Sequence, residues 1–158
     1  MEPSGNNPTA TRTDLATIVA DVLGDMAFLV SDDEPAEVPP GSVWLECTIT
    51  YRGPMSGTLR CWCTRDFAHQ LAANLLGLDP DDEEAVAGTT DALCEFMNVT
   101  CGQLVTALHG TEPVFDLSIP TVTECSEAPR FDENDHDVAC ELSVSGEPFY
   151  CVYEKGRA

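Results

Sequence analysis

A narrow polar stripe within a long apolar segment, Thr89 to His109, is the part of the sequence best suited to chemistry. Steps of three and four residues place five of its residues on one side of a predicted helix: Asp91, Glu95, Asn98, Gly102 and Thr106. Glu95 and Asn98 are one turn apart, so their Cβ atoms would lie roughly 5 to 6 Å from each other. A carboxylate can bind a cation, and a carboxamide can both donate and accept hydrogen bonds. The stripe is therefore the candidate working surface.

The rest of this segment predicts burial against a core. Its apolar face is formed by Leu93, Phe96, Met97, Thr100, Leu104, Ala107 and Leu108, and Cys94, Cys101 and Val105 widen it. A helix with one broad apolar face and one narrow polar stripe belongs on the surface of a core.

The middle of the predicted helix contains residues that weaken it. Asn98, Thr100 and Gly102 are all poor helix formers, and Gly costs about 1 kcal/mol relative to Ala in a helix interior. These residues suggest a role other than helix stability. At Gly102, the absence of a side chain would let another backbone approach closely. On these residues alone, however, an ordinary solvated stripe with Gly102 packed against a neighbouring element is favoured, because two polar residues one turn apart are common.

These positions resemble the active-site signature of the CheC/CheX/FliY chemotaxis phosphatases. The matching run is Asp91-x-x-x-Glu95-x-x-Asn98-x-x-x-Gly102, with Pro120 further along the chain. The similarity extends over most of the chain, from about Leu15 to Tyr153, in the order of helices and strands. A single Glu/Asn pair resembles the CheX branch more than CheC.

The resemblance implies a cytoplasmic phosphatase that hydrolyses the aspartyl phosphate of a CheY-like response regulator. In that interpretation Asn98 orients the attacking water, and Glu95 forms a salt bridge with a lysine of the regulator. Gly102 allows close approach, and Asp91 contributes a peripheral contact or only a charge at the helix start. The chain needs no cofactor or metal of its own, because the regulator carries the Mg²⁺. The family also implies a homodimer joined through sheet edges.

Two other classes of function stay open. The chain could be a non-catalytic module of the same fold that binds a regulator or dimerises without hydrolysis. It could also be a structural or metal-binding α/β domain in which the Glu95/Asn98 pairing is chance. Turnover of a phosphorylated regulator separates the first alternative from the phosphatase, and metal analysis tests the second.

Composition excludes some partners. The 158 residues carry 7 Lys and Arg against 28 Asp and Glu, a net charge of −21, so a nucleic-acid partner is not expected. No run approaches the roughly 20 apolar residues that span a bilayer, and residues 1–10 lack the order of a signal peptide. We therefore expect a cytoplasmic protein whose eight cysteines are reduced.

Residue patterns predict one α+β domain, residues 13–156, after a disordered tail, residues 1–12. Helices are expected from Thr13, over Asp66 to Leu76 and over the central segment, with a loop at Ser31 to Gly41. Hairpins are predicted at 43–64 and 136–154, and one or two short strands, broken at Pro120, at 114–123. The fold class is an antiparallel sheet of about five to six strands packed against long helices, in two pseudo-repeated helix–hairpin halves.

The repeat is suggested by a short echo. Residues 21–28 look like a worn copy of residues 91–98, with Asp25 and Phe28 in place of Glu95 and Asn98. We therefore predict no active role for the first helix.

Other constellations are weaker. Cys61-x-Cys63 with His69 lacks the loop spacing of zinc ligands and fits a core hairpin better. The group Asp132, Asn134, Asp135 and Asp137 lacks the turn glycine and the distant Glu of a calcium loop. His109 ends the central helix, where a cationic cap is the expected role.

Overall fold

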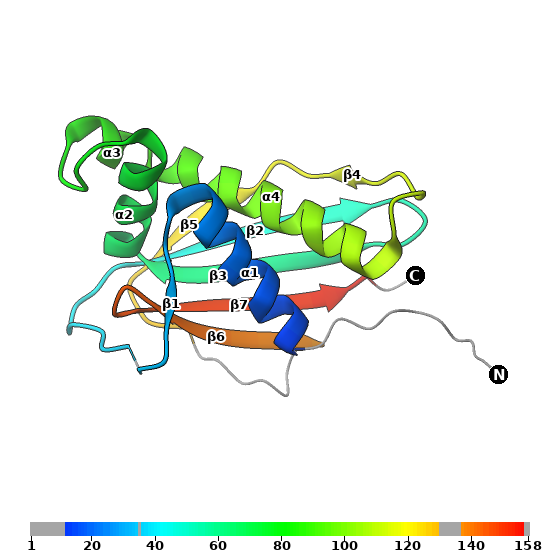
Figure 1. Cartoon of the computed structure of the whole chain (residues 1–158), viewed down its shortest axis with the longest axis horizontal. Coiled ribbons are helices and arrows are strands. Elements are labelled where there is room, and N and C mark those ends of the chain that lie inside the picture. Colours follow the sequence, from blue (N-terminus) through cyan, green and yellow to red (C-terminus); the bar gives the residue numbers. More distant parts are fainter. Residues whose placement is uncertain (1–11, 35, 130–136, 157–158) are drawn as a thin grey trace.

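The computed structural model describes residues 12–34, 36–129 and 137–156. In this part of the chain, two long helices lie across one face of an antiparallel sheet (Figure 1). The helices are α1 (Arg12–Ala27), α2 (Arg65–Leu76), α3 (Glu83–Ala87) and α4 (Thr89–His109). The strands are β1 (Ser31–Asp32), β2 (Trp44–Arg52), β3 (Gly57–Thr64), β4 (Asp116–Leu117), β5 (Thr121–Cys125), β6 (Val138–Val144) and β7 (Glu147–Lys155). The predicted α+β fold class is confirmed.

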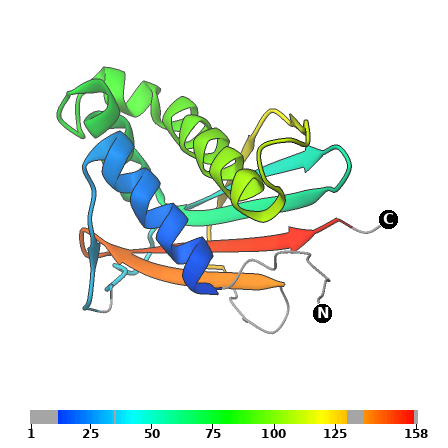
Figure 2. The same cartoon turned by 45° about the vertical axis from the view of Figure 1, so that its right-hand side comes forward.

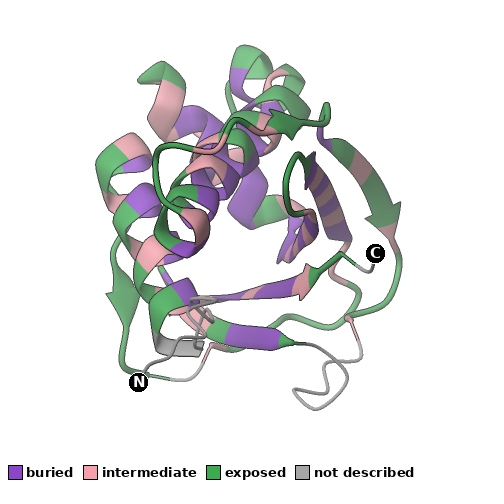
Figure 3. Cartoon of the chain, turned by 90° about the vertical axis from the view of Figure 1, so that its right-hand side faces the viewer, coloured by how far each residue is buried: buried purple, intermediate pink, exposed green. Residues whose placement is uncertain are grey.

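The core fills the space between the helices and the sheet. Alternation along the strands turns one set of side chains, including Cys47, Ile49 and Tyr51 of β2, toward the helices, and these are buried. Figure 3 shows the buried residues gathered where the helices face the sheet. The sequence pattern that predicted the two hairpins is thus the pattern that builds the core.

The sheet is organised as two halves. Each half has a long helix and a hairpin, α1 with β2–β3 and α4 with β6–β7. The second strands of the hairpins, β3 and β7, pair in the middle of the sheet, with Cys61 opposite Cys151. Each long helix packs on the other half's hairpin, since α1 contacts β6 and α4 contacts β2. The predicted helix–hairpin halves are therefore present and interlocked.

The edges of the sheet hold the short strands. β4 and β5 both pair with β2, with Leu117 opposite Tyr51 and Val122 opposite Cys47. The chain that leaves α4 therefore returns beside this helix, as Figures 1 and 2 show. The predicted break at Pro120 is confirmed, because β4 ends before it and β5 begins after it.

One predicted loop is partly wrong. Ser31 and Asp32 form β1, which pairs with Val144 and Ser143 of β6. Two residues are too few to carry an alternating pattern, so this strand leaves no signal in the sequence.

The α2 helix has clear caps at both ends. The side chain of Thr64 accepts a hydrogen bond from the Phe67 backbone N–H at 3.1 Å. At the other end, Gly77 takes the left-handed conformation with φ of 70°, and its N–H bonds to the carbonyl of Ala73. These caps fix where the helix begins and ends, close to the predicted limits.

Two predictions fall mainly on residues that the structure does not describe. Residues 1–11 of the predicted tail lie outside the described residues, as do Asp132, Asn134 and Asp135 of the calcium-like group. Within the described part, no helix is both long and apolar enough to cross a membrane.

Candidate functional site

The orientation of α4 about its own axis is fixed by its buried face. The ring of Phe96 is fully buried and meets Phe149 edge to face, with the ring centroids 5.4 Å apart. One turn on, buried Thr100 donates from Oγ1 to the carbonyl of Phe96 at 2.8 Å, which satisfies its hydroxyl. The predicted apolar face is confirmed except at Ala107, which is exposed. The opposite side of the helix is thereby held toward solvent.

The predicted polar stripe lies on that solvent side. Asp91, Glu95, Asn98 and Thr106 are exposed, and Gly102 is half-buried. In the described part of the chain, neither the Glu95 carboxylate nor the Asn98 carboxamide forms a hydrogen bond or an ion pair with another residue. The carboxylate and the carboxamide are thus both available to a molecule outside the chain.

Gly102 is not required by packing within the chain. A Cβ atom built at this position has no heavy atom within 4 Å, apart from its chain neighbours and the backbone of its own helix turns. The alternative in which Gly102 packs against a neighbouring element is therefore wrong. The helix carries the cost of a glycine, about 1 kcal/mol relative to Ala, without an internal steric reason.

The β4–β5 connection flanks the first half of α4. Cys94 Sγ donates to the carbonyl oxygen of Pro120 at 3.7 Å, and Pro120 is buried. Because Cys94 precedes Glu95, this contact ties the connection to the helix beside the stripe. The sequence placed Pro120 at the end of an edge strand, but gave no sign of its contact with Cys94.

The C-terminal end of α4 holds a small aromatic cluster. His109 Nε2 lies 2.8 Å from the Tyr51 hydroxyl, which is also 2.8 Å from the Tyr153 hydroxyl. The ring of His109 packs against the ring of Phe115 in a tilted arrangement, with the two centroids 5.1 Å apart. Burial lowers the pKa of His109 below its ordinary 6.5, which favours the neutral imidazole. This direction runs against the predicted cationic cap, and at this end of the helix the Gly110 N–H bonds to the Thr106 carbonyl.

Seven of the eight thiols lie on the helix-facing side of the sheet or on α4. Register places four of them in one row across β6, β7, β3 and β2: Cys140, Cys151, Cys61 and Cys47. Burial raises the pKa of Cys94 to about 11 and that of Cys101 to about 12, so both thiols are protonated at neutral pH. All eight cysteines are free. The seven on the helix-facing side or on α4 act as small apolar side chains, as predicted.

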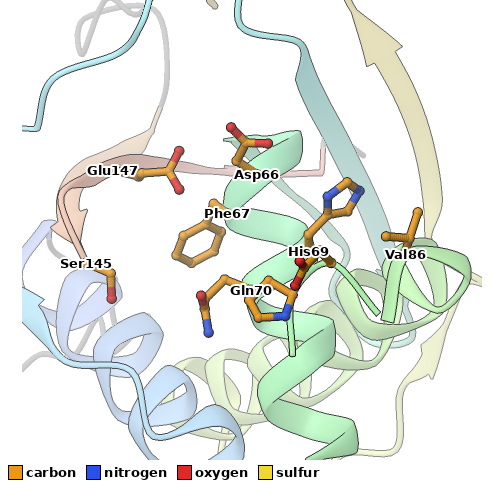
Figure 4. Close-up of a pocket in the computed structure, with 9 residues that line it drawn as sticks. Asp66, Phe67, His69, Gln70, Val86, Ser145 and Glu147 are labelled. Carbon is orange, nitrogen blue, oxygen red and sulfur yellow. The ribbon is translucent and has the colours of Figure 1, made fainter. Parts of the chain in front are cut away.

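A separate hollow of about 520 Å³ lies beside α2, at the β6–β7 turn. Glu147, Asp66 and Phe67 are among the residues that line it (Figure 4). Thr64 Oγ1 donates to Glu147 Oε1, and burial raises the pKa of this half-buried carboxyl. None of the stripe residues lines this hollow. In the described residues, moreover, no group of three or more His, Cys, Asp or Glu side chains is placed to hold a metal ion.

The first helix does not present a second stripe. α1 ends at Ala27, and Phe28, which corresponds to Asn98 in the sequence echo, takes a left-handed conformation with φ of 58°. Its N–H bonds to the Gly24 carbonyl at 3.1 Å as the helix stops. Of the two long helices in the described part of the chain, α4 therefore presents the acid–amide pair and α1 does not.

The fold and the exposed side of α4 together define an α+β domain of two interlocked halves. The polar stripe of α4, which carries the acid–amide pair Glu95 and Asn98, forms a ridge that we call the α4 ridge. A family model described as "Chemotaxis phosphatase CheX" matches residues 45–143, which include α4. The chain belongs to this family of chemotaxis phosphatases. A comparison with curated proteins gives no match.

Solved structures of the family share the fold. A chemotaxis protein CheX from Desulfovibrio desulfuricans is 19% identical, with a TM-score of 0.64 over 90% of this chain and 96% of that one. The CheX of a CheX–CheY–BeF3–Mg complex from Borrelia burgdorferi is 19% identical, with a TM-score of 0.63 over 94% and 99%. FliY from Thermotoga maritima is 15% identical, with a TM-score of 0.54 over 96% and 91%. At these identities the likeness shows the fold.

Proposed function

We propose that this chain dephosphorylates a CheY-like response regulator by hydrolysing its aspartyl phosphate. Membership of the chemotaxis phosphatase family supports the reaction class. A fold relative from Borrelia burgdorferi has been solved in complex with CheY, which supports the class of partner. The substrate is then a protein, and the site must be a surface that another protein can cover.

The α4 ridge is the part of the chain suited to that task. Asn98 is exposed, and its carboxamide is neutral across physiological pH, so it can orient a water by donating and accepting hydrogen bonds without acting as a base. Phosphoryl transfer depends mainly on positioning and electrostatic stabilisation, which suits such a group. We assign Asn98 the orientation of the attacking water.

Glu95 and Gly102 would hold the regulator in register. Glu95, one turn from Asn98, would pair with the lysine of the regulator's phosphorylation pocket, which fixes the position of Asn98 over phosphorus. Gly102, one turn further, would let the partner's backbone approach α4, and Asp91 would make a peripheral contact at the helix start. The phospho-aspartate and its Mg²⁺ belong to the regulator.

One observation carries the proposal: Glu95, Asn98 and Gly102 of the α4 ridge have no evident role in stabilising the described part of the chain. Glu95 and Asn98 are exposed, and their side chains have no hydrogen-bond or ion-pair partner in the described residues. A Cβ atom added at Gly102 would meet open space. Residues that lower helix stability without making a compensating contact inside the chain are expected where they contact an external partner.

The competing function is a regulator-binding or dimerisation module without hydrolysis. Trace amounts of the chain are to be mixed with a large excess of phosphorylated regulator, and the release of inorganic phosphate followed. A phosphatase releases many equivalents of phosphate per chain, and Asn98→Ala abolishes this turnover. A chain that binds the regulator but leaves its phosphate lifetime unchanged would be a binding module, and the proposed hydrolysis would be wrong.

A further inference from the structure

A single apolar side chain stands out beside the α4 ridge. Ile119 is 87% exposed, the largest exposed fraction among the large hydrophobic residues in the described part of the chain. It lies in the β4–β5 connection, next to Pro120, whose carbonyl accepts the hydrogen bond from Cys94. An isolated exposed hydrophobe is common. Ile119 differs because its backbone is anchored on both sides and because it lies beside α4.

The backbone on both sides of Ile119 is anchored. On one side, the Ser118 N–H donates to the Thr50 carbonyl at 2.8 Å, and Ser118 Oγ accepts from the Thr50 N–H at 2.9 Å. On the other side, Pro120 is buried and bonded to Cys94 of α4. Ile119 is therefore presented by a fixed backbone, so little conformational freedom is lost when a partner covers it.

These anchors also place Ile119 along α4. Cys94 lies next to Glu95 in sequence and one turn before Asn98, on the side of the helix that faces the connection. Ile119 is thus beside the half of α4 that carries the acid–amide pair. The other end of the helix, with His109, is contacted by Phe115, which lies before β4.

We propose that Ile119 is an apolar contact for the response regulator, so that the docking surface extends from the α4 ridge onto the β4–β5 connection. This inference rests on the proposed function, because it names a further part of the same docking surface. The ridge offers an acidic and an amide side chain, and both this chain and a phosphorylated pocket are negatively charged. A desolvated apolar contact adds affinity without adding to that repulsion.

Val114 provides a matched control. It is 82% exposed, in the connection from α4 to β4, and it precedes Phe115, which packs against His109 at the C-terminal end of α4. Fifteen residues of helix, about 22 Å, separate Cys94 from His109. Ile119→Ser and Val114→Ser thus remove similar exposed side chains, the first next to Pro120, which contacts Cys94, and the second next to Phe115, which contacts His109.

The experiment measures regulator affinity by titration and phosphate release at saturating and limiting regulator. We expect Ile119→Ser to raise Kd and KM about tenfold and to leave kcat within about twofold, because the side chain does not touch the phosphoryl group. Val114→Ser should change neither constant, and Ile119→Val should recover most of the affinity. The thermal unfolding midpoint should stay unchanged in all three variants.

Two results would overturn the inference. An unchanged Kd for Ile119→Ser, while Glu95→Ala still weakens binding, would remove Ile119 from the docking surface and leave the proposed function standing. Conversion of a dimer to a monomer by Ile119→Ser, measured by sedimentation at unchanged regulator affinity, would assign this edge to a second copy of the chain. If the unmutated protein released no phosphate and bound no regulator, the proposed function itself would fail.

Discussion

Phe96 and Asn98 lie on opposite sides of α4, one fully buried and one exposed. The ring of Phe96 is held against Phe149 with centroids 5.4 Å apart, and the orientation of the helix follows from this packing. The packing of Phe96, two positions away, thus holds Asn98 toward solvent, and in the described residues the Asn98 carboxamide has no hydrogen-bond partner. Stability and the proposed chemistry are therefore carried by different residues of the same turn, and can be separated experimentally.

Asn98→Ala and Glu95→Ala should affect different steps. Loss of the water-orienting amide is expected to lower phosphate release at saturating regulator by about a hundredfold or more, with Kd changed by less than about threefold. Loss of the Glu95 carboxylate is expected to weaken regulator binding by about tenfold, because a charge-assisted contact is removed. Phosphate release and regulator titration on each variant provide the two measurements.

Gln103→Ala is the control for these substitutions. Gln103 is also an exposed polar residue of α4, but it lies outside the stripe. It should leave both phosphate release and Kd unchanged. Equal phosphate release by Asn98→Ala and by the unmutated protein would contradict the role given to Asn98.

Gly102→Ala should make the protein more stable and the docking weaker. An alanine methyl group has open space at this position, so the free energy of unfolding is expected to rise by up to about 1 kcal/mol through helix propensity. The same methyl group would stand between α4 and an approaching backbone, so regulator affinity should fall. Urea unfolding and regulator titration measure the two effects.

Gly57→Ala gives the opposite outcome for stability. A Cβ atom at Gly57 would lie 2.7 Å from Tyr51 Cε1 and 2.9 Å from Tyr153 Cε1, so the hydrogen-bonded tyrosine pair would have to move. We expect a loss of about 1 to 3 kcal/mol, as for other overpacked sites. Gly102→Ala that lost stability in the same way would show that Gly102 serves packing after all.

The sequence was informative where a pattern repeats along the chain. Alternation in residues 43–64 predicted the β2–β3 hairpin, and helical spacing predicted which side of α4 is exposed, including Glu95 and Asn98. These predictions succeed because burial of one face is decided by many residues at once, so a single exception such as Ala107 does not disturb them.

The sequence was uninformative where one contact decides the outcome. β1 depends on two backbone pairs, and the neutral state favoured for His109 depends on burial beside Tyr51, which is distant along the chain. The open space around Gly102 likewise depends on which residues lie nearby in the fold. A glycine in the sequence could equally mean close packing within the chain or close approach of an external partner. Ile119 was missed for the same reason, since its anchors at Thr50 and Cys94 come from other elements.

Ionic strength should affect the rate of docking. The chain has a net charge of −21, and a phosphorylated regulator pocket is also negative, so long-range repulsion slows their encounter. Added salt screens this repulsion, and the association rate should first rise, until pairing between Glu95 and the regulator's lysine weakens. Stopped-flow association between about 20 and 300 mM salt measures the effect, because the Debye length falls below about 10 Å within this range. A rate that declined from the first addition of salt would count against docking of two acidic surfaces.

Glu147→Gln should stabilise the protein at neutral pH and lose this effect in acid. Burial raises the pKa of Glu147 above its ordinary 4.5, the hydrogen bond from Thr64 opposes this, and nearby Asp66 adds to it. Between 4.5 and the raised pKa the folded state therefore binds more protons than the unfolded state, and stability falls as pH rises through this window. Above the window the folded protein holds a half-buried carboxylate at a cost that glutamine avoids, while the glutamine oxygen can still accept from Thr64.

The measurement for Glu147→Gln is the thermal unfolding midpoint of variant and unmutated protein from pH 4 to pH 8. The variant should unfold at a higher temperature at pH 7 to 8, and the difference should shrink as pH falls through the raised pKa and below 4.5, because the carboxyl then becomes protonated in both states. Glu112→Gln, at an exposed residue, controls for the removal of one negative charge from an acidic protein. A Glu147→Gln variant that was less stable at pH 7 would mean that its carboxylate stabilises the fold. The hydrogen bond from Thr64 would then outweigh the cost of burying the charge.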